Sequence, residues 1–324
     1  MPAISSLPMW EDEEFASEEF VPSQINTIRM SLSGICTRLI QDSALYKEGW
    51  DSLRPPNFWR FAMKFPPDTV VVNIAKTREI VEVLSLKEVR AWPEKRKKRY
   101  EDSLRTAYKQ GKKGEIFFTS GRNHFYQFSK VLPEIDKAIA LFQDEGTDPW
   151  YAQTILLIES PGRLQFSTEG AYGAFQLMEG VARDVGLIVN DSIDERTEFD
   201  KSARGAARLI QRICIPKARA LCKQYKLNYR EHDIWFRLLV MHVYHAGIGN
   251  VRRVFRKMRP KEGGIPLITK LWQTKGRRFG NASQNYSQIA LSALLELDDL
   301  VEQEGIICPL DQQEDGSFQE GHIR

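Results

Sequence analysis

The chain has 324 residues, of which 42% are hydrophobic and 27% charged, and its formal net charge is +3. This is an ordinary globular composition, long enough for one large domain or two smaller ones. Apolar runs of roughly 18 residues are absent from the sequence, which excludes a membrane-spanning helix.

Charge is unevenly distributed along the chain. Residues 11–19 are acidic, residues 87–113 hold eleven Lys or Arg against four acids, and residues 251–278 hold ten against one. A nucleic-acid interface needs a basic face with a recognition element or interleaved stacking aromatics. The first basic run instead mixes acids into helical spacing, which is typical of a solvated helix face. We therefore expect no nucleic-acid partner, with contact to an anionic cell-wall or membrane surface as the alternative.

Residues 1–24 are expected to form a flexible acidic lead-in. They lack the basic-then-apolar order of a signal peptide, so the chain is either cytoplasmic or lacks its export signal.

The four cysteines form no CxxC motif and no metal-ligand spacing. They are Cys36, Cys214, Cys222 and Cys308. Cys214 and Cys222 lie eight positions apart in one helical segment, about 12 Å at 1.5 Å per residue, which is too far for a disulfide. We favour buried thiols, and the cysteine count does not decide the compartment.

Residues 25–125 are predicted to form a small α+β region, in which we recognise no catalytic chemistry. Apolar residues three and four apart predict a helix over 25–48. A stretch rich in Pro and aromatic residues follows, then two β-prone runs, TVVVNIA and EIVEVLSL, whose spacing predicts a hairpin. A basic helix is expected at about 86–110, and EIFFTSG is a possible third strand.

Residues 126–305 have helical periodicity throughout, so the fold class is mainly α, and 306–324 are expected to be a disordered tail. One amphipathic helix ends at Gly146, and the next starts with Asp148 as N-cap and stops at Ser160. Further helices are predicted at AYGAFQLMEGVARDVG, at SARGAARLIQRIC with a bend at Pro216, at DIWFRLLVMHVYHAG, at 249–258, at 266–273 and at about 284–303.

Glu159 is an unusual acid, because it follows three aliphatic residues at the predicted end of a helix. The helix C-terminus carries partial negative charge, and aliphatic neighbours remove water, so both effects raise the pKa of the carboxyl group. A raised pKa suits a general acid that must hold a proton near neutrality. A Glu that points to solvent at a frayed helix end is the alternative.

Other segments could form a groove with this acid. Gly170 and Gly173, three apart at a predicted helix start, would let a ligand approach the backbone, and Gln176 on the same face would offer an amide to sugar groups. Each glycine could equally serve packing. Tyr244 and His245 end a later helix, where such residues are often core or capping groups.

Together these blocks resemble the SLT domain of lytic murein transglycosylases, in the branch of the membrane-bound type D enzyme. The resemblance covers about residues 147–300. Its motifs occur in the order ES, S-x-x-G-A-x-G-x-x-Q-x-M and Y-x-A-G. The matching positions are Glu159-Ser160, Ser167, Gly170, Ala171, Gly173, Gln176, Met178, Tyr244, Ala246 and Gly247, with VGLIVNDSIDERTEFDKSARGAARLI similar to the family's connecting stretch. Tyr286 falls where the family has a late Tyr near the cleft.

The chain departs from the family pattern at several points. The stretch from Glu159 to Ser167 is one residue shorter, His245 replaces the usual Asn, and Val181 replaces the usual Thr. Residues 1–125 match nothing that we identify in the family, and the carbohydrate-binding repeats of this branch are absent.

The resemblance implies a lysozyme-like fold, related to goose-type lysozyme, that cleaves the MurNAc-β-1,4-GlcNAc bond of peptidoglycan without water. Glu159 would act first as acid and then as base, leaving a 1,6-anhydro-MurNAc end. The expected glycan-binding residues are Ser167, Gly173, Gln176, Met178, Tyr244, His245 and Tyr286. Neither a metal nor a cofactor is expected.

Two other functions stay open from the sequence. A goose-type hydrolase would need a second acid across the cleft, and a non-catalytic peptidoglycan-binding or scaffold protein would keep the groove alone. Because peptidoglycan is the expected partner, we expect a location in the periplasm or cell envelope, with a possible envelope partner for the N-terminal region.

Overall fold

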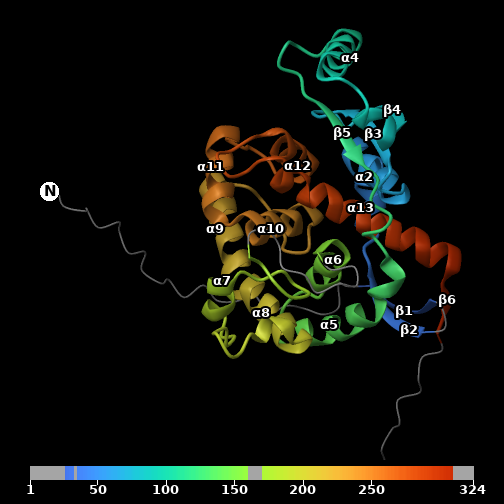
Figure 1. Ribbon diagram of the computed structural model, residues 1–324. Helices are drawn as coiled ribbons and strands as arrows, with labels where there is room; N and C mark the ends of the chain where they lie inside the picture. The colour runs from blue at the N-terminus through green and yellow to red at the C-terminus, as the bar shows by residue number, and fades with distance from the viewer. Residues whose placement is uncertain (1–25, 33–34, 160–169, 309–324) are drawn as a thin grey trace, which may run out of the picture.

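The computed structural model describes residues 26–32, 35–159 and 170–308, and it is mainly helical with two small sheets (Figure 1). The predicted lead-in at 1–24 and residues 309–324 of the predicted tail lie outside the described residues. Among the described helices, none combines the length and apolar character needed to cross a membrane.

The predicted helix over 25–48 is wrong. Strands β1 (Asn26–Leu32) and β2 (Ile35–Gln41) form an antiparallel hairpin there, and only the short α1 (Ala44–Lys47) is helical. A short apolar run is compatible with both the helical period and the strand period. The β-branched Ile and Thr residues of this segment favour strands. Gln153, in a distant helix, stabilises the strand conformation. Its side chain accepts from the Ile40 N–H at 2.9 Å and donates to the Ile40 carbonyl at 2.8 Å.

The chain returns to this hairpin after its last helix. Strand β6 (Ile306–Ile307) pairs antiparallel with β1, giving the order β2-β1-β6. A disulfide joins Cys36 to Cys308 across 272 positions of sequence. The prediction of buried thiols is therefore wrong for this pair, and residues 306–308 of the predicted tail are ordered. Cys214 and Cys222 are buried free thiols, as expected.

The second sheet confirms the predicted hairpin and third strand. Its central strand β3 (Thr69–Ile74) pairs antiparallel with β4 (Ile80–Ser85) and β5 (Ile116–Ser120). The single basic helix predicted at 86–110 is two helices, α3 (Leu86–Arg90) and α4 (Glu94–Ala107), because Pro93 interrupts it. Figure 1 shows α4 at the outer end of the molecule, beyond this sheet.

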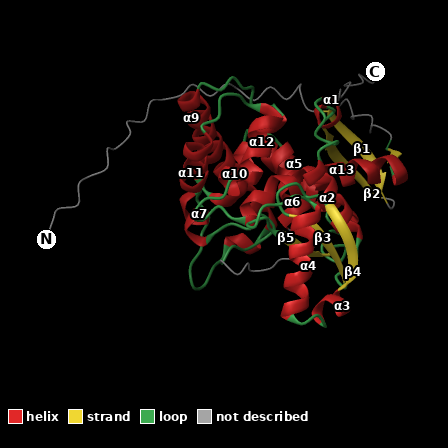
Figure 2. Cartoon of the chain, turned by 90° about the horizontal axis from the view of Figure 1, so that it is seen from above, coloured by secondary structure: helices red, strands yellow, loops and turns green. Residues whose placement is uncertain are grey.

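The Pro-rich aromatic stretch forms helix α2 (Arg54–Lys64), with prolines in its first turn. This helix packs on the long α13 (Asn281–Glu304), where the Trp59 indole donates to Gln288 at 3.1 Å. Figure 2 shows α2 beside α13 and close to the second sheet. One cluster of buried side chains runs from Met30 through α2 to Val301, so the core is continuous between the N-terminal and helical regions.

Apart from the helix predicted over AYGAFQLMEGVARDVG, the predicted helices of the C-terminal region are confirmed, with small shifts at their ends. The helices of this region are α5 (Leu132–Asp144), α6 (Trp150–Glu159), α7 (Glu179–Asp184), α8 (Phe199–Leu209), α9 (Ile215–Tyr225), α10 (Ile234–Ala246), α11 (Ile248–Met258), α12 (Gly264–Gln273) and α13. The bend expected at Pro216 is a π-helical turn over Ile210–Cys214, which joins α8 to α9.

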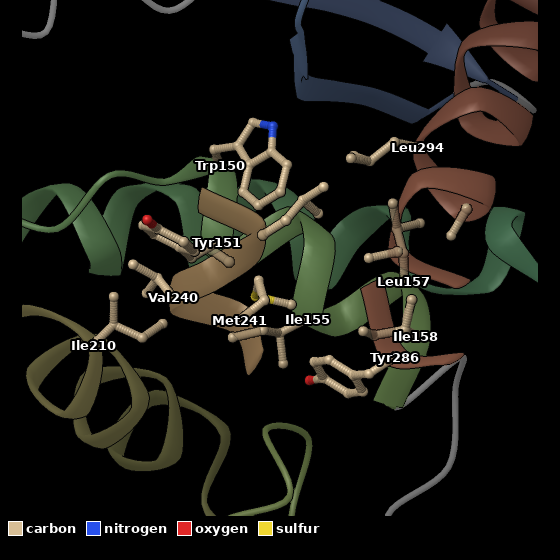
Figure 3. Close-up of a cluster of buried hydrophobic side chains, with 14 of the residues drawn as sticks. Trp150, Tyr151, Ile155, Leu157, Ile158, Ile210, Val240, Met241, Tyr286 and Leu294 are labelled. Atoms are coloured by element: carbon tan, nitrogen blue, oxygen red, sulfur yellow. The ribbon is translucent and has the colours of Figure 1, made fainter. Parts of the chain in front are cut away.

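Helix α6 lies at the centre of this body. Every residue from Trp150 to Ile158 is buried, and the helix contacts α5 and α13. Figure 3 shows Val240 and Met241 of α10 beside it, and Tyr286 of α13 beside Ile158 near its carboxyl end. A helix apolar on all sides is held rigidly by its neighbours.

The start of α6 is fixed by the predicted N-cap. The Asp148 carboxylate accepts from the Trp150 N–H at 2.9 Å. It also pairs at 2.7 Å with Arg237, a buried residue of α10 that reaches Asp42 at 2.8 Å. Because both ends of this ion pair are anchored in the core, α6 cannot slide along its axis without breaking it.

The helix predicted over AYGAFQLMEGVARDVG is mostly wrong, because only Glu179–Asp184 is helical. The residues before it make a tight turn in which Tyr172 pairs with Leu177. Gly170, Gly173 and Gln176 have φ angles of 87°, 81° and 49°. Left-handed backbone of this kind ends a helix, so the argument that Gly173 and Gln176 share one helix face fails.

Candidate active site

Glu159 is the last residue of α6 and is partly buried. Burial raises the pKa of its carboxyl group to about 7, and a hydrogen-bonding interaction with Tyr286 opposes part of that rise. The helix C-terminus adds its own unfavourable field for an anion. A carboxyl group in this environment is partly protonated near neutrality, which is the state that a general acid requires.

Three phenol groups surround this acid. Burial and the nearby Glu159 charge both raise the pKa of Tyr126, Tyr244 and Tyr286, so all three stay protonated at neutral pH. The Tyr244 hydroxyl donates to the Phe175 carbonyl at 2.5 Å. The buried Tyr286 hydroxyl interacts with the Glu159 carboxylate, and this interaction raises the pKa of Tyr286 and lowers that of Glu159.

His245 completes this group from the end of α10. Its imidazole stacks on the Tyr286 ring, with ring centroids 4.1 Å apart and an interplanar angle of 18°. The surrounding side chains remove water and lower the pKa of His245 below its ordinary value. A neutral imidazole stacked on the phenol fixes the plane of the Tyr286 ring beside the acid.

A cavity of about 740 Å³, here called the active-site cavity, opens beside Glu159. One wall comes from the ends of α6, α10 and α13. The opposite wall comes from the second sheet and α4. Its lining includes Glu159, His245, Tyr286, Arg122, Tyr126, Lys97, Glu101 and residues 116–120 of β5. The N-terminal region, in which the sequence showed no chemistry, thus contributes half of this cavity.

Glu101 of α4 is the other carboxylate in the described lining of the cavity. It forms an ion pair with Arg105 at 2.9 Å. Among the described residues, the causes that shift the pKa of Glu159 are burial and Tyr286, and Glu101 is not one of them. Glu101 therefore lines the cavity as part of an ion pair.

The remaining predicted residues lie elsewhere. Ser167 is outside the described residues. A Cβ added to Gly173 would lie 2.0 Å from the Arg196 carbonyl oxygen, so this glycine serves close packing in the turn. The Gln176 amide donates to the Gly173 carbonyl at 2.9 Å, and Met178 precedes α7 with 43% of its surface exposed. In the described part of the chain, these three do not line the active-site cavity.

Sequence reasoning missed Arg122 and Tyr126. Both follow β5 and line the same cavity as Glu159. The Arg122 charge lowers the pKa of Tyr126, and the Glu159 charge raises it. The segment RNHFYQF combines a cation with three aromatic residues, a composition that could have drawn attention to it. Its position opposite Glu159 depends on the packing of α2 against α13.

No protein-family model, curated protein or solved structure matches this chain.

Proposed function

We propose that this protein is a peptidoglycan lytic transglycosylase of lysozyme-like fold, with Glu159 as its single catalytic carboxylate. The observation that carries the proposal is the Glu159 carboxyl group, whose pKa is about 7, at the end of a buried helix beside a cavity of about 740 Å³. The ordered motifs around Glu159, Gly173 and Tyr244 support the same family.

The proposed reaction uses one proton twice. Glu159 donates its proton to the oxygen between MurNAc and GlcNAc, and the bond from that oxygen to the MurNAc anomeric carbon breaks. The N-acetyl oxygen of the same sugar supports the developing positive charge. The Glu159 carboxylate then removes the proton of the 6-hydroxyl, whose oxygen bonds to the anomeric carbon. The proton balance closes without water.

The aromatic side chains have roles that follow from their positions. The Tyr286 hydroxyl interacts with the Glu159 carboxylate and would hold the acid in position beside the sugar. His245 holds the Tyr286 ring by stacking. Tyr126, on the opposite wall, presents a ring against which the apolar face of a sugar can pack.

A hydrolase of the goose-type lysozyme class is the nearest rival. Ordinary glycosidases use two carboxylates about 5 to 9.5 Å apart. Glu101 is the candidate for the second carboxylate, but it forms an ion pair with Arg105 at 2.9 Å. The Glu101→Gln variant separates the two classes, because only the hydrolase requires that carboxylate.

The disulfide supports an exported protein. Disulfides persist in the periplasm and outside the cell, and they are rare in the reducing cytosol. The Cys36–Cys308 bond therefore fits the location of the peptidoglycan substrate. We propose a periplasmic or cell-envelope location on these grounds.

The function is tested with purified peptidoglycan. The parent chain should release soluble fragments, and Glu159→Gln should reduce release by about 10³-fold or more while binding to the polymer persists. Glu101→Gln is the matched control and should retain most activity. Equal release by the parent and Glu159→Gln would remove Glu159 from the mechanism, and binding without release by either would indicate a scaffold protein.

A further inference from the structure

Arg78 is a buried cation outside the reaction centre. It follows β3 in the turn to β4 and is only 4% exposed. Its guanidinium donates to three neutral amide oxygens, those of Asn73 at 3.0 Å, Asn285 at 2.5 Å and Asn281 at 3.3 Å. Two of these partners belong to α13, so Arg78 connects the second sheet to the helical body.

Within the described residues, Arg78 has no carboxylate partner. Aromatic rings surround it instead, with Phe58, Trp59 and Phe117 centroids 5.1 to 5.4 Å from its guanidinium carbon. Its buried Nε has no hydrogen-bond partner. Burial lowers the pKa of Arg78 to about 10, with no acid to oppose it. A buried charge without a counter-ion is costly, which makes this arginine receptive to an anion.

Arg78 lies at the boundary of two cavities. One is the active-site cavity. The other, of about 450 Å³ and here called the Arg78 cavity, lies between the second sheet and helices α12 and α13. Phe117, Asn281 and Asn285 also line both. A branched ligand with its backbone in the active-site cavity could therefore place a side branch in the Arg78 cavity.

The rim of the Arg78 cavity is positively charged. Lys76 and Lys113 line it, are exposed and form no ion pair with any described residue. The acid Glu115 also lines the rim, but Lys275 pairs with it at 2.5 Å. The unbalanced charges of the cavity are thus all cationic, and they surround a buried guanidinium.

We propose that the Arg78 cavity is a binding site for a carboxylate of the peptide attached to the glycan strand. This inference rests on the proposed function for the identity of the ligand. The planar guanidinium suits a carboxylate, and Phe117 and Trp272 offer apolar surface to the alkyl portion of a peptide. The amides of Gln110 and Gln273 line the same cavity and can bond peptide groups.

The site is tested by calorimetry with a free peptide rather than with glycan. The probe is L-alanyl-γ-D-glutamyl-diaminopimelate, and its counterpart has every carboxylate converted to an amide. The parent chain should bind the acid form at least about tenfold more tightly than the amide form, because charge-assisted bonds to Arg78 are lost on amidation. Equal affinity for the two forms would overturn the proposal.

Substitutions in the Arg78 cavity test whether the peptide binds there. Lys76→Gln and Lys113→Gln should each lower the affinity for the acid form of the peptide by about twofold to fivefold, since these exposed cations act at the rim. Lys98→Gln is the matched control, because Lys98 is exposed on α4 and lines neither cavity. Arg78→Gln should abolish the preference for the acid form. If that variant does not fold, unchanged affinity in both rim variants still contradicts the site.

The two proposals fail in different ways. Tight, carboxylate-dependent peptide binding by a chain that never cleaves glycan would refute the transglycosylase reaction and leave the Arg78 site. Glycan cleavage by a chain that binds both peptide forms equally would refute the Arg78 site alone and make Arg78 a structural cation held by its aromatic neighbours.

Discussion

The imidazole of His245 stacks on the phenol ring of Tyr286, with ring centroids 4.1 Å apart, at the position where Tyr286 faces Glu159. The pair joins the end of α10 to the first turns of α13. In the resembling family an Asn occupies the position of His245. The stack shows what the histidine does here, which is to orient a ring that faces the acid.

His245→Ala should therefore reduce turnover by about tenfold or more without abolishing it, since Tyr286 loses its stacking partner. His245→Phe, which keeps a flat ring, should retain more activity than His245→Ala. The measurement is the rate of fragment release from purified peptidoglycan at saturating substrate. A phenylalanine variant as slow as the alanine variant would show that imidazole chemistry, rather than stacking, is needed.

The activity of the parent chain should decline as pH rises through about 7, because Glu159 must be protonated to donate and its pKa is about 7. Tyr286→Phe removes the hydroxyl that lowers this pKa, so the declining limb should move to higher pH while the maximum rate falls. Rate profiles from pH 4 to 9 test both expectations. A limb that stays in place in Tyr286→Phe would exclude an interaction between the two side chains.

Glu159 should also make stability depend on pH. Its pKa is about 7 in the folded chain against 4.5 for an unperturbed glutamate, so between these values the folded state holds more protons than the unfolded state. The free energy of unfolding should then decrease as pH rises from about 4.5 to 7. Glu159→Gln removes this penalty and should stabilise the chain by about 3 kcal/mol at pH 8 but not at pH 4. Urea unfolding at both pH values measures the difference, and a destabilised variant at pH 8 would argue for a paired carboxylate.

The disulfide should contribute to stability through the length of the loop that it closes. With 272 positions between Cys36 and Cys308, the loss of this bond should cost about 2 to 5 kcal/mol. Cys36→Ser should show this loss under oxidising conditions, and a reducing agent should lower the melting temperature of the parent but not of the variant. Cys222→Ser, at a buried free thiol, is the control for any effect of sulfur removal on packing.

Apart from the helix predicted over AYGAFQLMEGVARDVG, the helices of the C-terminal region could be predicted because they are amphipathic or fully buried and have start or stop signals. Asp148 caps α6 as its position before Pro149 indicates, and Gly247 ends α10. The acid at the end of α6 could be predicted on the same grounds. Local sequence contains all the information that these features require.

Features that depend on distant contacts could not be predicted. The hairpin at 26–41 needs Gln153 to bind Ile40, and the Cys36–Cys308 bond needs two segments at opposite ends of the sequence. Gln176 has a left-handed φ of 49°, which the residue type Gln does not predict. The wall formed by β5 and Tyr126 exists only because α2 packs on α13, which no local pattern encodes.

The mass of the released fragments tests the central claim most directly. If Glu159 alone performs both proton transfers, the fragments released from peptidoglycan should end in 1,6-anhydro-MurNAc and weigh one water less than reducing ends. Addition of isotopically labelled water should leave those masses unchanged. Reducing ends that carry the label, lost in both Glu159→Gln and Glu101→Gln, would contradict the account and assign the chain a two-carboxylate hydrolysis.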